Sequence, residues 1–598
     1  QDIANTLWSY GTAYHTAPEL FDAATKETIR KIDQFNSQAL TNTVWSYARL
    51  GHHSPDLFNA AAPEAVKKLE TFNAQEIANT LWSYAKVGYR APELFDAASY
   101  EASKKLYRFN SQNIANTLWS YGTMGHAAPE LFDAAALEAV TKFYQFNCQA
   151  LSNTIWSYGK MRHNAPELFH AAALEAIRKL AHFSSQDIAN TLWSYARLGY
   201  DAPELFDAAA LTAIRNFKDF NSQALSNMLW SYGKMKYASP DLFDAAALEA
   251  VNMLDQFNSQ DIANTVWSYA RVGHYAPELF DTAALEAIKK IDQFNSQNIA
   301  NTLWSYGKMD HAAPELFDAM ASKAIEKLDT FTSQDIANTL WSYGTIGHPA
   351  PKFFDAAALE AIKKIDEFNS QELGNTLWSY GTLGHHAPKF FDVAIATSIK
   401  KLGTFNSQET INTLWALAVM DLNVEGAMIF LHRIIEQFKS NHDYLSVEGL
   451  CQLYQVLLWL QYEQKKKIIL PKSLSDKCLM SFSDSQGDPS LLQKDVAATF
   501  RSLNYEVHEE VTCNQTGYSI DAVVVMETGN EVSVEVDGPS HFVGSLPTGA
   551  TLLKRRQLKH NGGRPLLSIP YWNWYALSGQ KSEKQEFLRR CITIIRSR

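Results

Sequence analysis

Four side chains that can hydrogen bond or carry charge recur along this chain in a fixed pattern. Within residues 257–274 they are Asp261, Asn264, Ser268 and Arg271, at offsets 0, +3, +7 and +10. Carboxylate, amide and hydroxyl groups exchange hydrogen bonds with the edges of nucleic-acid bases, and guanidinium groups bind phosphates. Because these offsets follow one stripe of a helix, the pattern predicts a polar contact surface.

The first of the four positions changes between recurrences but uses only Asp, Glu, Asn and Ala. Along the chain it is Asp2, Ala39, Glu76, Asn113, Ala150, Asp187, Ala224, Asp261, Asn298, Asp335, Glu372 and Glu409. Ala is followed by Leu-Thr or Leu-Ser, whereas Asp and Asn are followed by Ile-Ala. Such a small hydrogen-bonding alphabet suits base-by-base reading of single-stranded RNA, in which two or three side chains per helical repeat contact one base.

The second position is asparagine in every recurrence, from Asn5 through Asn264 to Asn412. We expect it to contact RNA, to satisfy buried backbone groups between units, or to do both. The fourth position is basic in seven recurrences, at Arg49, Lys86, Lys160, Arg197, Lys234, Arg271 and Lys308. We expect this basic row to bind phosphates and to make affinity depend on salt; the alternative is a solvated charged face.

The aromatic residues of each recurring WSY motif have two interpretations. We expect Trp267, Tyr269 and their equivalents to be core residues rather than platforms on which bases stack. The Gly-His pairs that follow, such as Gly273-His274, are expected to be surface turns rather than metal ligands.

The elements that position these side chains follow from a strict 37-residue period. Twelve tryptophans, from Trp8 to Trp415, are each separated by 37 residues. Each unit has one helix from the Asn258-Ser259 cap to Gly273, and another from Ala276-Pro277-Glu278. Two short helices cannot bury their apolar faces alone, so the units must stack. The prediction is a mainly α fold: a right-handed α-solenoid of twelve 37-residue helix-turn-helix repeats over residues 1–439.

The net charge, the cysteines and the apolar runs limit the class of protein to which this chain can belong. The formal net charge of −11 over 598 residues excludes a uniformly basic nucleic-acid binder, so any affinity for RNA must come from a local stripe. Five cysteines show no zinc-binding spacing, and no apolar run reaches the roughly 18 residues of a membrane span. Because Gln1 lies in mid-repeat, we expect a fragment from which a targeting peptide could have been lost.

The pattern changes towards the C-terminus. The twelfth unit decays after Trp415, residues 440–488 are expected to be a helical cap and linker, and the polar stretch 471–490 is predicted to be linker. From 489 to 598 the predicted order is αβββαβ, a small α/β domain.

This last segment closely resembles the RAP domain. The matching residues are Leu492-Gln493, Tyr505-Glu506-Val507, Asp521, EVDGPSHF at 535–542, TLLKR at 551–555, Gly563 and IPYW at 569–572. The array resembles the octotricopeptide and heptatricopeptide RNA-binding repeats that accompany RAP domains, and its length is closer to the second type. Proteins combining the two are nucleus-encoded factors of plastids or mitochondria, acting in RNA processing, RNA stability, ribosomal RNA maturation or translation.

RAP domains also resemble the PD-(D/E)XK nuclease-like fold. That resemblance implies that Asp521 and Glu535 would hold a divalent metal such as Mg²⁺, with Asp537 and His541 nearby. The lysine of the motif is Asp537 here, and the candidates to replace it are Lys554 and Arg555 on the following helix. The alternative is that Asp521 and the EVDG turn only stabilise the domain.

The sequence thus favours an organellar, plastid or mitochondrial protein that binds single-stranded RNA at about one base per repeat. RNA binding itself implies no cofactor; Mg²⁺ enters only if the RAP domain is an RNA endonuclease, which is one alternative. A protein-scaffolding solenoid is another. The expected partners are single-stranded organellar RNA and other RNA-processing proteins.

Overall fold

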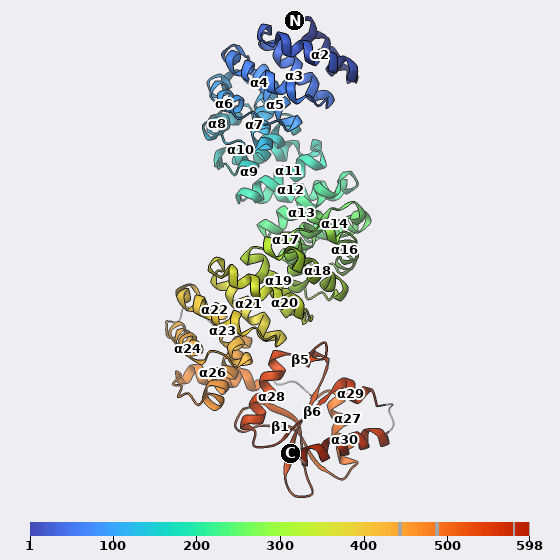
Figure 1. The fold of residues 1–598 in the computed structure, drawn as a ribbon, viewed down its shortest axis with the longest axis vertical. Coiled ribbons are helices and arrows are strands. Elements are labelled where there is room, and N and C mark those ends of the chain that lie inside the picture. The colour runs from blue at the N-terminus through green and yellow to red at the C-terminus, as the bar shows by residue number, and fades with distance from the viewer. Residues whose placement is uncertain (441–444, 485–488, 578–580, 597–598) are drawn as a thin grey trace. The chain divides into compact units, whose positions relative to one another are not determined.

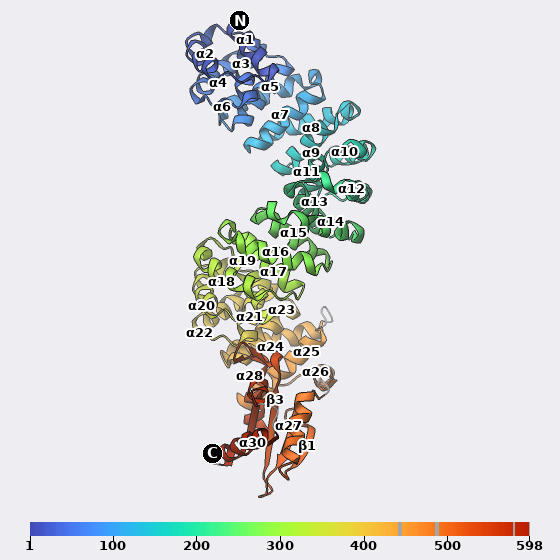
Figure 2. The ribbon, with the colours of Figure 1, turned by 90° about the vertical axis from the view of Figure 1, so that its right-hand side faces the viewer.

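The computed structural model describes residues 1–440, 445–484, 489–577 and 581–596. The chain divides into two compact units, Gln1–Glu286 and Ala287–Arg598, and each is described by itself. Both contain helical repeats, and the second also contains the small α/β domain (Figures 1 and 2).

The first helix of each repeat packs against the first helices of its neighbours within a unit. In Gln1–Glu286 these helices are α1 (Asp2–Ala13), α3 (Ser37–Leu50), α5 (Ala74–Val87), α7 (Ser111–Met124), α9 (Cys148–Met161), α11 (Ser185–Leu198), α13 (Ser222–Met235) and α15 (Ser259–Val272). In Ala287–Arg598 they are α17 (Ser296–Lys308), α19 (Ser333–Ile346), α21 (Ser370–Leu383) and α23 (Ser407–Met420).

Within each unit the second helices also pack against their neighbours. They are α2 (Pro18–Lys31), α4 (Pro55–Lys68), α6 (Pro92–Lys105), α8 (Pro129–Lys142), α10 (Pro166–Lys179), α12 (Pro203–Asn216), α14 (Pro240–Met253), α16 (Pro277–Lys289), α18 (Pro314–Lys327), α20 (Pro351–Lys363), α22 (Pro388–Lys400) and α24 (Val424–Lys439). Each of the first eleven begins with proline, as predicted, because proline has no N–H group to leave unpaired at a helix start. The described residues therefore confirm the helix-turn-helix solenoid.

Three contacts recur between consecutive repeats. The Tyr158 hydroxyl donates to the Phe132 carbonyl at 2.7 Å, and its equivalents do the same. The Lys142 ammonium at the end of α8 donates to the Tyr107 and Phe109 carbonyls of the preceding repeat at 3.2 and 2.8 Å. A third contact joins turn histidines to second helices, as in His274 with Asp244 at 2.8 Å. The Gly-His pairs therefore link repeats in surface turns.

The repeat pattern ends at α23 and α24, where Trp415 is buried and its indole N–H donates to Gln455 at 2.7 Å. Helix α25 (Val447–Leu458) follows and runs into a π-helical turn at Trp459–Glu463. The prediction of a linker at 471–490 is wrong over most of its length. Lys472–Asp484 form α26, whose apolar residues Leu474, Cys478 and Phe482 are buried. The rest of that prediction includes residues 485–488, which lie outside the described residues.

The α/β domain has the predicted order αβββαβ. Helix α27 (Leu491–Arg501) precedes strands β1 (Glu506–Thr512), β2 (Ser519–Val525) and β3 (Glu531–Asp537), then α28 (Gly549–Asn561) and β6 (Leu566–Pro570). The sheet order is β1-β2-β3-β6; β1, β2 and β3 pair antiparallel, and β6 pairs parallel to β3. The structure adds the short pair β4 (Phe542–Val543) and β5 (Leu546–Pro547) and the helices α29 (Tyr571–Tyr575) and α30 (Lys581–Arg596).

Val496, Phe500, Val534, Ile569 and Trp574 lie at the core of this domain. Alternation of side chains along β3 places Val534 and Val536 on the core side, so Glu535 and Asp537 point to the opposite face. None of the described helices is long and apolar enough to cross a membrane.

Candidate nucleic-acid interface

The changeable residue of each repeat is the third residue of its first helix, where it can complete a capping box. In α11 the Asp187 N–H donates to the Ser184 hydroxyl at 3.2 Å, and the Ser184 N–H donates to the Asp187 carboxylate at 3.1 Å. The same reciprocal pairs are Asn73–Glu76, Asn110–Asn113, Asn258–Asp261, Asn295–Asn298, Thr332–Asp335, Asn369–Glu372 and Asn406–Glu409. Because a capping box needs a short acceptor side chain here, it accounts for the Asp, Glu and Asn residues at the changeable position.

These residues present little side-chain surface. The buried ones are Ala39, Asn113, Ala150, Ala224, Asp261, Asn298 and Asp335. The half-buried ones are Glu76, Asp187, Glu372 and Glu409, whereas Asp2 at the chain start is exposed. That these residues read bases stays a prediction. Helix capping is a second role, and it would also restrict this position to the same few residue types.

Hydrogen bonds between repeats account for the Ala-Leu-Ser combination. The Ser152 hydroxyl donates to Asp187 Oδ1 at 2.9 Å, and the Ser226 hydroxyl donates to Asp261 Oδ1 at 2.7 Å. Each serine lies two residues after an alanine letter, and each aspartate is the letter of the next repeat. The residue types at the changeable positions of neighbouring repeats are therefore coupled through these hydrogen bonds.

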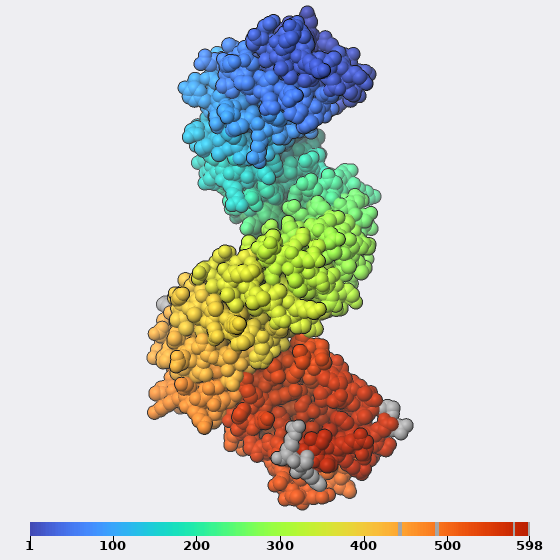
Figure 3. Space-filling model, viewed as in Figure 1, coloured from blue at the N-terminus to red at the C-terminus, as the bar shows by residue number. Residues whose placement is uncertain are grey.

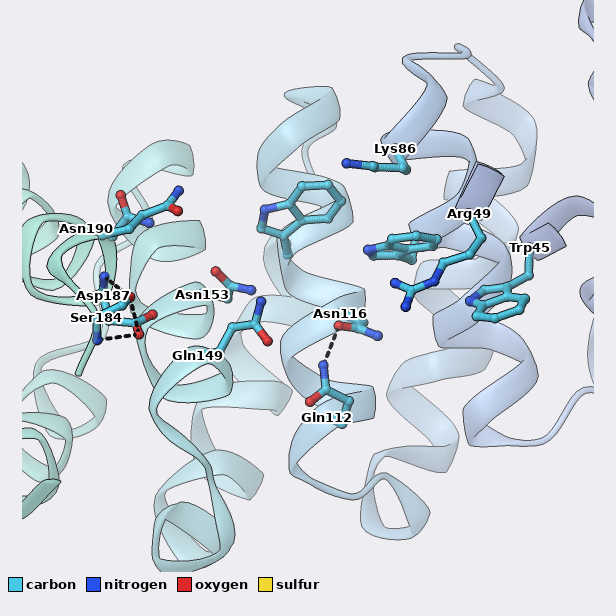
Figure 4. Close-up of a pocket in the computed structure, with 13 residues that line it drawn as sticks. Trp45, Arg49, Lys86, Gln112, Asn116, Gln149, Asn153, Ser184, Asp187 and Asn190 are labelled. Carbon is cyan, nitrogen blue, oxygen red and sulfur yellow. Dashed lines mark hydrogen bonds between the residues drawn. The ribbon is translucent and has the colours of Figure 1, made fainter. Parts of the chain in front are cut away.

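An open groove lies along the first helices of Gln1–Glu286. Its cavity of about 550 Å³ is lined by residues of α3, α5, α7, α9 and α11, and by the cap residue Ser184. Figure 4 shows Gln112, Asn116, Gln149 and Asn153 projecting from successive helices into this space. The Gln112 amide donates to Asn116 Oδ1 at 2.8 Å. These invariant asparagines are half-buried, so they are not a fully buried ladder between repeats.

The tryptophans behave differently from the tyrosines. Tyr121 and its equivalents are fully buried, as predicted for core residues. Trp45, Trp82 and Trp119 are half-buried and line the groove, so the purely core interpretation is wrong for the tryptophans. The Trp230 and Trp267 rings lie at 24° to each other with centroids 6.4 Å apart. A half-exposed indole is a surface on which a base can stack.

The basic row borders these tryptophans. All seven predicted residues are exposed, and none of them forms an ion pair within the described ranges. The Arg49 guanidinium lies 5.8 Å from the Trp45 ring centroid, and the Arg197 guanidinium lies 5.4 Å from that of Trp193. Desolvation by the surrounding side chains and the nearby Arg162 charge lower the pKa of Arg197. Unpaired cations beside aromatic rings are suited to bind phosphates.

Towards the C-terminus the basic row stops, and the α/β domain covers the helix ends. The positions equivalent to Arg271 are Thr345, Thr382 and Val419 in α19, α21 and α23. The Arg556 guanidinium of α28 donates to the Val419 carbonyl at 2.8 Å and to Glu463 at 2.7 Å. A β-carbon on Gly549 would lie only 1.8 Å from the Gly381 carbonyl oxygen. The α/β domain and the ends of these first helices are therefore in close contact within Ala287–Arg598 (Figure 3).

The predicted catalytic residues of the RAP domain do come together. The Lys554 ammonium of α28 lies 2.6 Å from Glu535 Oε2. The Asp521 carboxylate accepts hydrogen bonds from Gln493 at 2.7 Å and from the Val536 N–H at 2.6 Å. Asp537 accepts from His541 at 3.0 Å, and from Arg555 and Ser568 at 2.6 Å each.

Burial dominates the electrostatics of this cluster. It raises the pKa of Glu535 to about 8 against the opposing charge of Lys554, and the Asp521 charge adds to the rise. Burial also raises the pKa of Asp521, although Lys554 opposes this. Burial acts in the same direction on Asp537, but hydrogen bonds from His541 and Ser568 and the charge of Arg555 outweigh it and lower the pKa to about 2.

The donor set does not fit the Mg²⁺ ion that the nuclease resemblance implies. In the described part of the chain, no three His, Cys, Asp or Glu side chains form a group that could hold a metal ion. Glu535 Oε2 is already in contact with Lys554, and Asp537 with Arg555. Glu535 Oε1 is buried and has no hydrogen-bond partner, but one oxygen does not make a metal site. We derive no metal-dependent step from this cluster.

Sequence reasoning gave no role to the glutamine before each changeable residue. Gln112, Gln149 and Gln186 line the groove, next to the predicted asparagines. The available signal was its invariance: glutamine occupies this position in all twelve repeats.

Comparison with known proteins supports both parts of this architecture. The model of the family described as RNA-editing substrate-binding complex 6 protein matches residues 28–248 and 278–427, and the RAP domain model matches residues 534–591. A protein of Oryza sativa subsp. japonica named "RAP domain-containing protein, chloroplastic" is 38% identical over 105 residues. That match spans 17% of this chain and 15% of the rice protein.

Solved structures of similar appearance are distant. A homology model of the AP-3 complex is 11% identical with a TM-score of 0.24, covering 81% of this chain and 90% of that chain. A crystal structure of a Kap121p mutant is 11% identical with a TM-score of 0.25, covering 85% of this chain and 61% of that chain. At these TM-scores, neither similarity supports a conclusion about this chain. The two family matches do: the chain belongs to the RNA-editing substrate-binding complex 6 protein family and has a RAP domain at its C-terminal end.

Proposed function

We propose that this protein binds single-stranded RNA along its first helices, at about one nucleotide per repeat. The observation that carries the proposal is the groove of Gln1–Glu286, where amide, indole and cationic side chains recur in the same order in successive repeats. Amides match base edges, indoles match base faces, and unpaired cations match phosphates. Protein-binding surfaces seldom repeat one polar stripe in this way, so scaffolding is less favoured.

The place of action proposed is an organelle, and specifically the plastid. The support is the name of the rice relative, which is chloroplastic, although only a small part of that protein is matched. The processes proposed are RNA processing, stability, ribosomal RNA maturation or translation, with other RNA-processing proteins as partners. The RAP domain would then contribute contacts rather than cleavage, because Glu535 and Asp537 are already in contact with basic side chains.

Fluorescence anisotropy with a labelled random-sequence RNA tests the binding proposal. A variant with Lys160, Arg197 and Lys234 changed to Ala should lose about tenfold or more in affinity, since each lost phosphate contact weakens binding. A matched variant changes Arg178, Arg215 and Lys218, which are exposed outside the first helices, to Ala. Equal losses in both variants, or no RNA binding by the unchanged protein, would overturn the proposal.

A further inference from the structure

Two amide side chains of the groove, a glutamine and an asparagine, recur in every repeat. Glutamine is the second residue of the first helix in all repeats that begin inside the chain, and asparagine follows four residues later. The glutamines are Gln1, Gln38, Gln75, Gln112, Gln149, Gln186, Gln223, Gln260, Gln297, Gln334, Gln371 and Gln408. Apart from half-buried Gln112, they are exposed. Residues four apart lie on one helix face, so each repeat presents one amide pair.

The oxygens of the changeable residue are engaged within the array, although Asp187 itself lines the groove. Asp187 Oδ2 accepts from the Ser184 N–H and hydroxyl, and Asp187 Oδ1 accepts from Ser152 of the preceding repeat. Asp261 is engaged in the same way by Asn258 and Ser226, and only 4% of it is exposed. With these oxygens already occupied, replacing one letter by another changes helix capping more than the groove.

The Gln112–Asn116 pair leaves a donor and an acceptor available. Where the Gln112 amide nitrogen donates to Asn116 Oδ1, Gln112 Oε1 remains an acceptor and the Asn116 amide nitrogen remains a donor. A donor beside an acceptor is the side-chain pattern that binds adenine in two places, as Asn and Gln do at its N6 and N7 atoms. The half-buried indoles of Trp82 and Trp119 line the same groove, and stacking on them adds a modest preference for the larger face of a purine.

The basic row does not select a base. Arginine is the side chain that reads guanine through two hydrogen bonds, but this row alternates between Arg and Lys and is Thr123 in α7. Since Lys offers only a point charge, a position that accepts either residue fits a phosphate better than a base edge.

We infer that the groove reads the same base at each repeat and that its preferred ligand is a run of adenines in single-stranded RNA. The inference rests on the proposed RNA-binding function and names its substrate class. A surface whose amide pairs and indoles do not vary selects a uniform ligand, whereas a code carried by the changeable residue would select a mixed sequence.

Competition on the full chain tests the inference, with oligoadenylate, oligouridylate, oligocytidylate and a mixed sequence, each of about twelve nucleotides. Oligoadenylate should bind about tenfold or more tightly than the others, because each two-point contact discriminates by about 1–3 kcal/mol. Changing Gln149, Gln186 and Gln223 to Ala should reduce that preference. Asn252→Ala, which removes an exposed amide from a second helix, should leave it unchanged.

Two results would overturn the inference. One is equal or tighter binding of the other oligonucleotides. The other is an Asp261→Asn protein whose preference changes at a single base, because that is the behaviour of a letter code. Failure to bind any of the RNAs is distinguishable from both, since it removes the proposed function itself.

Discussion

The Ser226 hydroxyl donates a hydrogen bond of 2.7 Å to Asp261 Oδ1 in the next repeat, while Asp261 Oδ2 accepts the Asn258 N–H at 3.2 Å. One carboxylate thus caps its own helix and joins it to the preceding helix. Ala224 precedes Ser226 by two residues and makes no such cap. The variation along the array is therefore partly a pattern of contacts between neighbours.

Replacing Asp261 by Ala should lower the free energy of unfolding by about 1–3 kcal/mol, since both the cap and the inter-repeat bond are lost. Chemical denaturation measures the effect, with Asp219→Ala as an exposed control. A double-mutant cycle with Ser226→Ala should give a coupling of about 0.5 kcal/mol or more. Strictly additive losses would show that the Ser226–Asp261 bond contributes nothing.

Replacing Lys142 by Met should also destabilise the array. Its ammonium donates to the Tyr107 and Phe109 carbonyls and lies 2.6 Å from Glu138. Leaving these partners without a cation should cost about 1–3 kcal/mol in thermal or chemical unfolding. Lys67→Met is the matched control, because that exposed lysine pairs only with Glu64 and should change stability by less than about 0.5 kcal/mol. Equal effects in the two proteins would show that the contacts of Lys142 with the preceding repeat do not stabilise the array.

Adding a methyl group at Gly549 should separate the RAP domain from the repeats. The new β-carbon would lie 1.8 Å from the Gly381 carbonyl oxygen. The backbone would have to move to relieve this overlap. We expect Gly549→Ala to lose about 1–3 kcal/mol of stability and to become more sensitive to limited proteolysis. Gly403→Ala is the control, since no atom lies within 4 Å of its β-carbon position. Unchanged proteolysis of Gly549→Ala would contradict the close contact.

The Glu535 pKa of about 8 predicts a pH dependence of stability. Because the folded pKa lies above the ordinary value of 4.5, the stabilisation is fully present below about pH 4.5 and is lost as pH rises through about 8. RAP-domain unfolding should therefore become easier over that range, by at most about 1.4 kcal/mol per pH unit. Glu535→Gln should flatten the profile, whereas exposed Glu586→Gln should not. A Glu535→Gln profile as steep as that of the unchanged protein would refute the assignment.

Salt dependence distinguishes phosphate contacts from general charge. If Lys160, Arg197, Lys234 and Arg271 each bind one phosphate, changing all four to Ala should reduce the slope of log affinity against log salt by about 3. A reduced affinity with an unchanged slope would mean that these residues support the groove without contacting phosphate. The measurement is RNA affinity at several salt concentrations.

The repeat fold could be predicted because each of its elements has a local signal. Pro277 marks the start of a second helix and recurs at 37-residue intervals, and Gly273 marks the end of a first helix and recurs in most repeats. The strands of the RAP domain were predictable for the same reason, since apolar residues alternate along β3 and form a short continuous run in β2. Helix α26 was missed because its Ser- and Asp-rich composition outweighed the spacing of Leu474, Cys478 and Phe482.

The site was predicted less well than the fold. The capping role of Asp187 was detectable, since a Ser three residues before an acid at a helix start is a capping-box signature. The exposure of Trp119 was not detectable, because the same apolar face of a helix contains core and groove residues. The covering of Val419 by Arg556 depends on a contact across 137 residues, and the loss of a basic residue at Val419 was its only sequence trace.

Photo-crosslinking of a bound single-stranded RNA to the full chain, followed by identification of the crosslinked residues, tests the central claim most directly. The account predicts crosslinks at Trp82, Trp119 and Trp156 and at the glutamines beside them, all on first helices. Crosslinks confined to the second helices or to the RAP domain would contradict it.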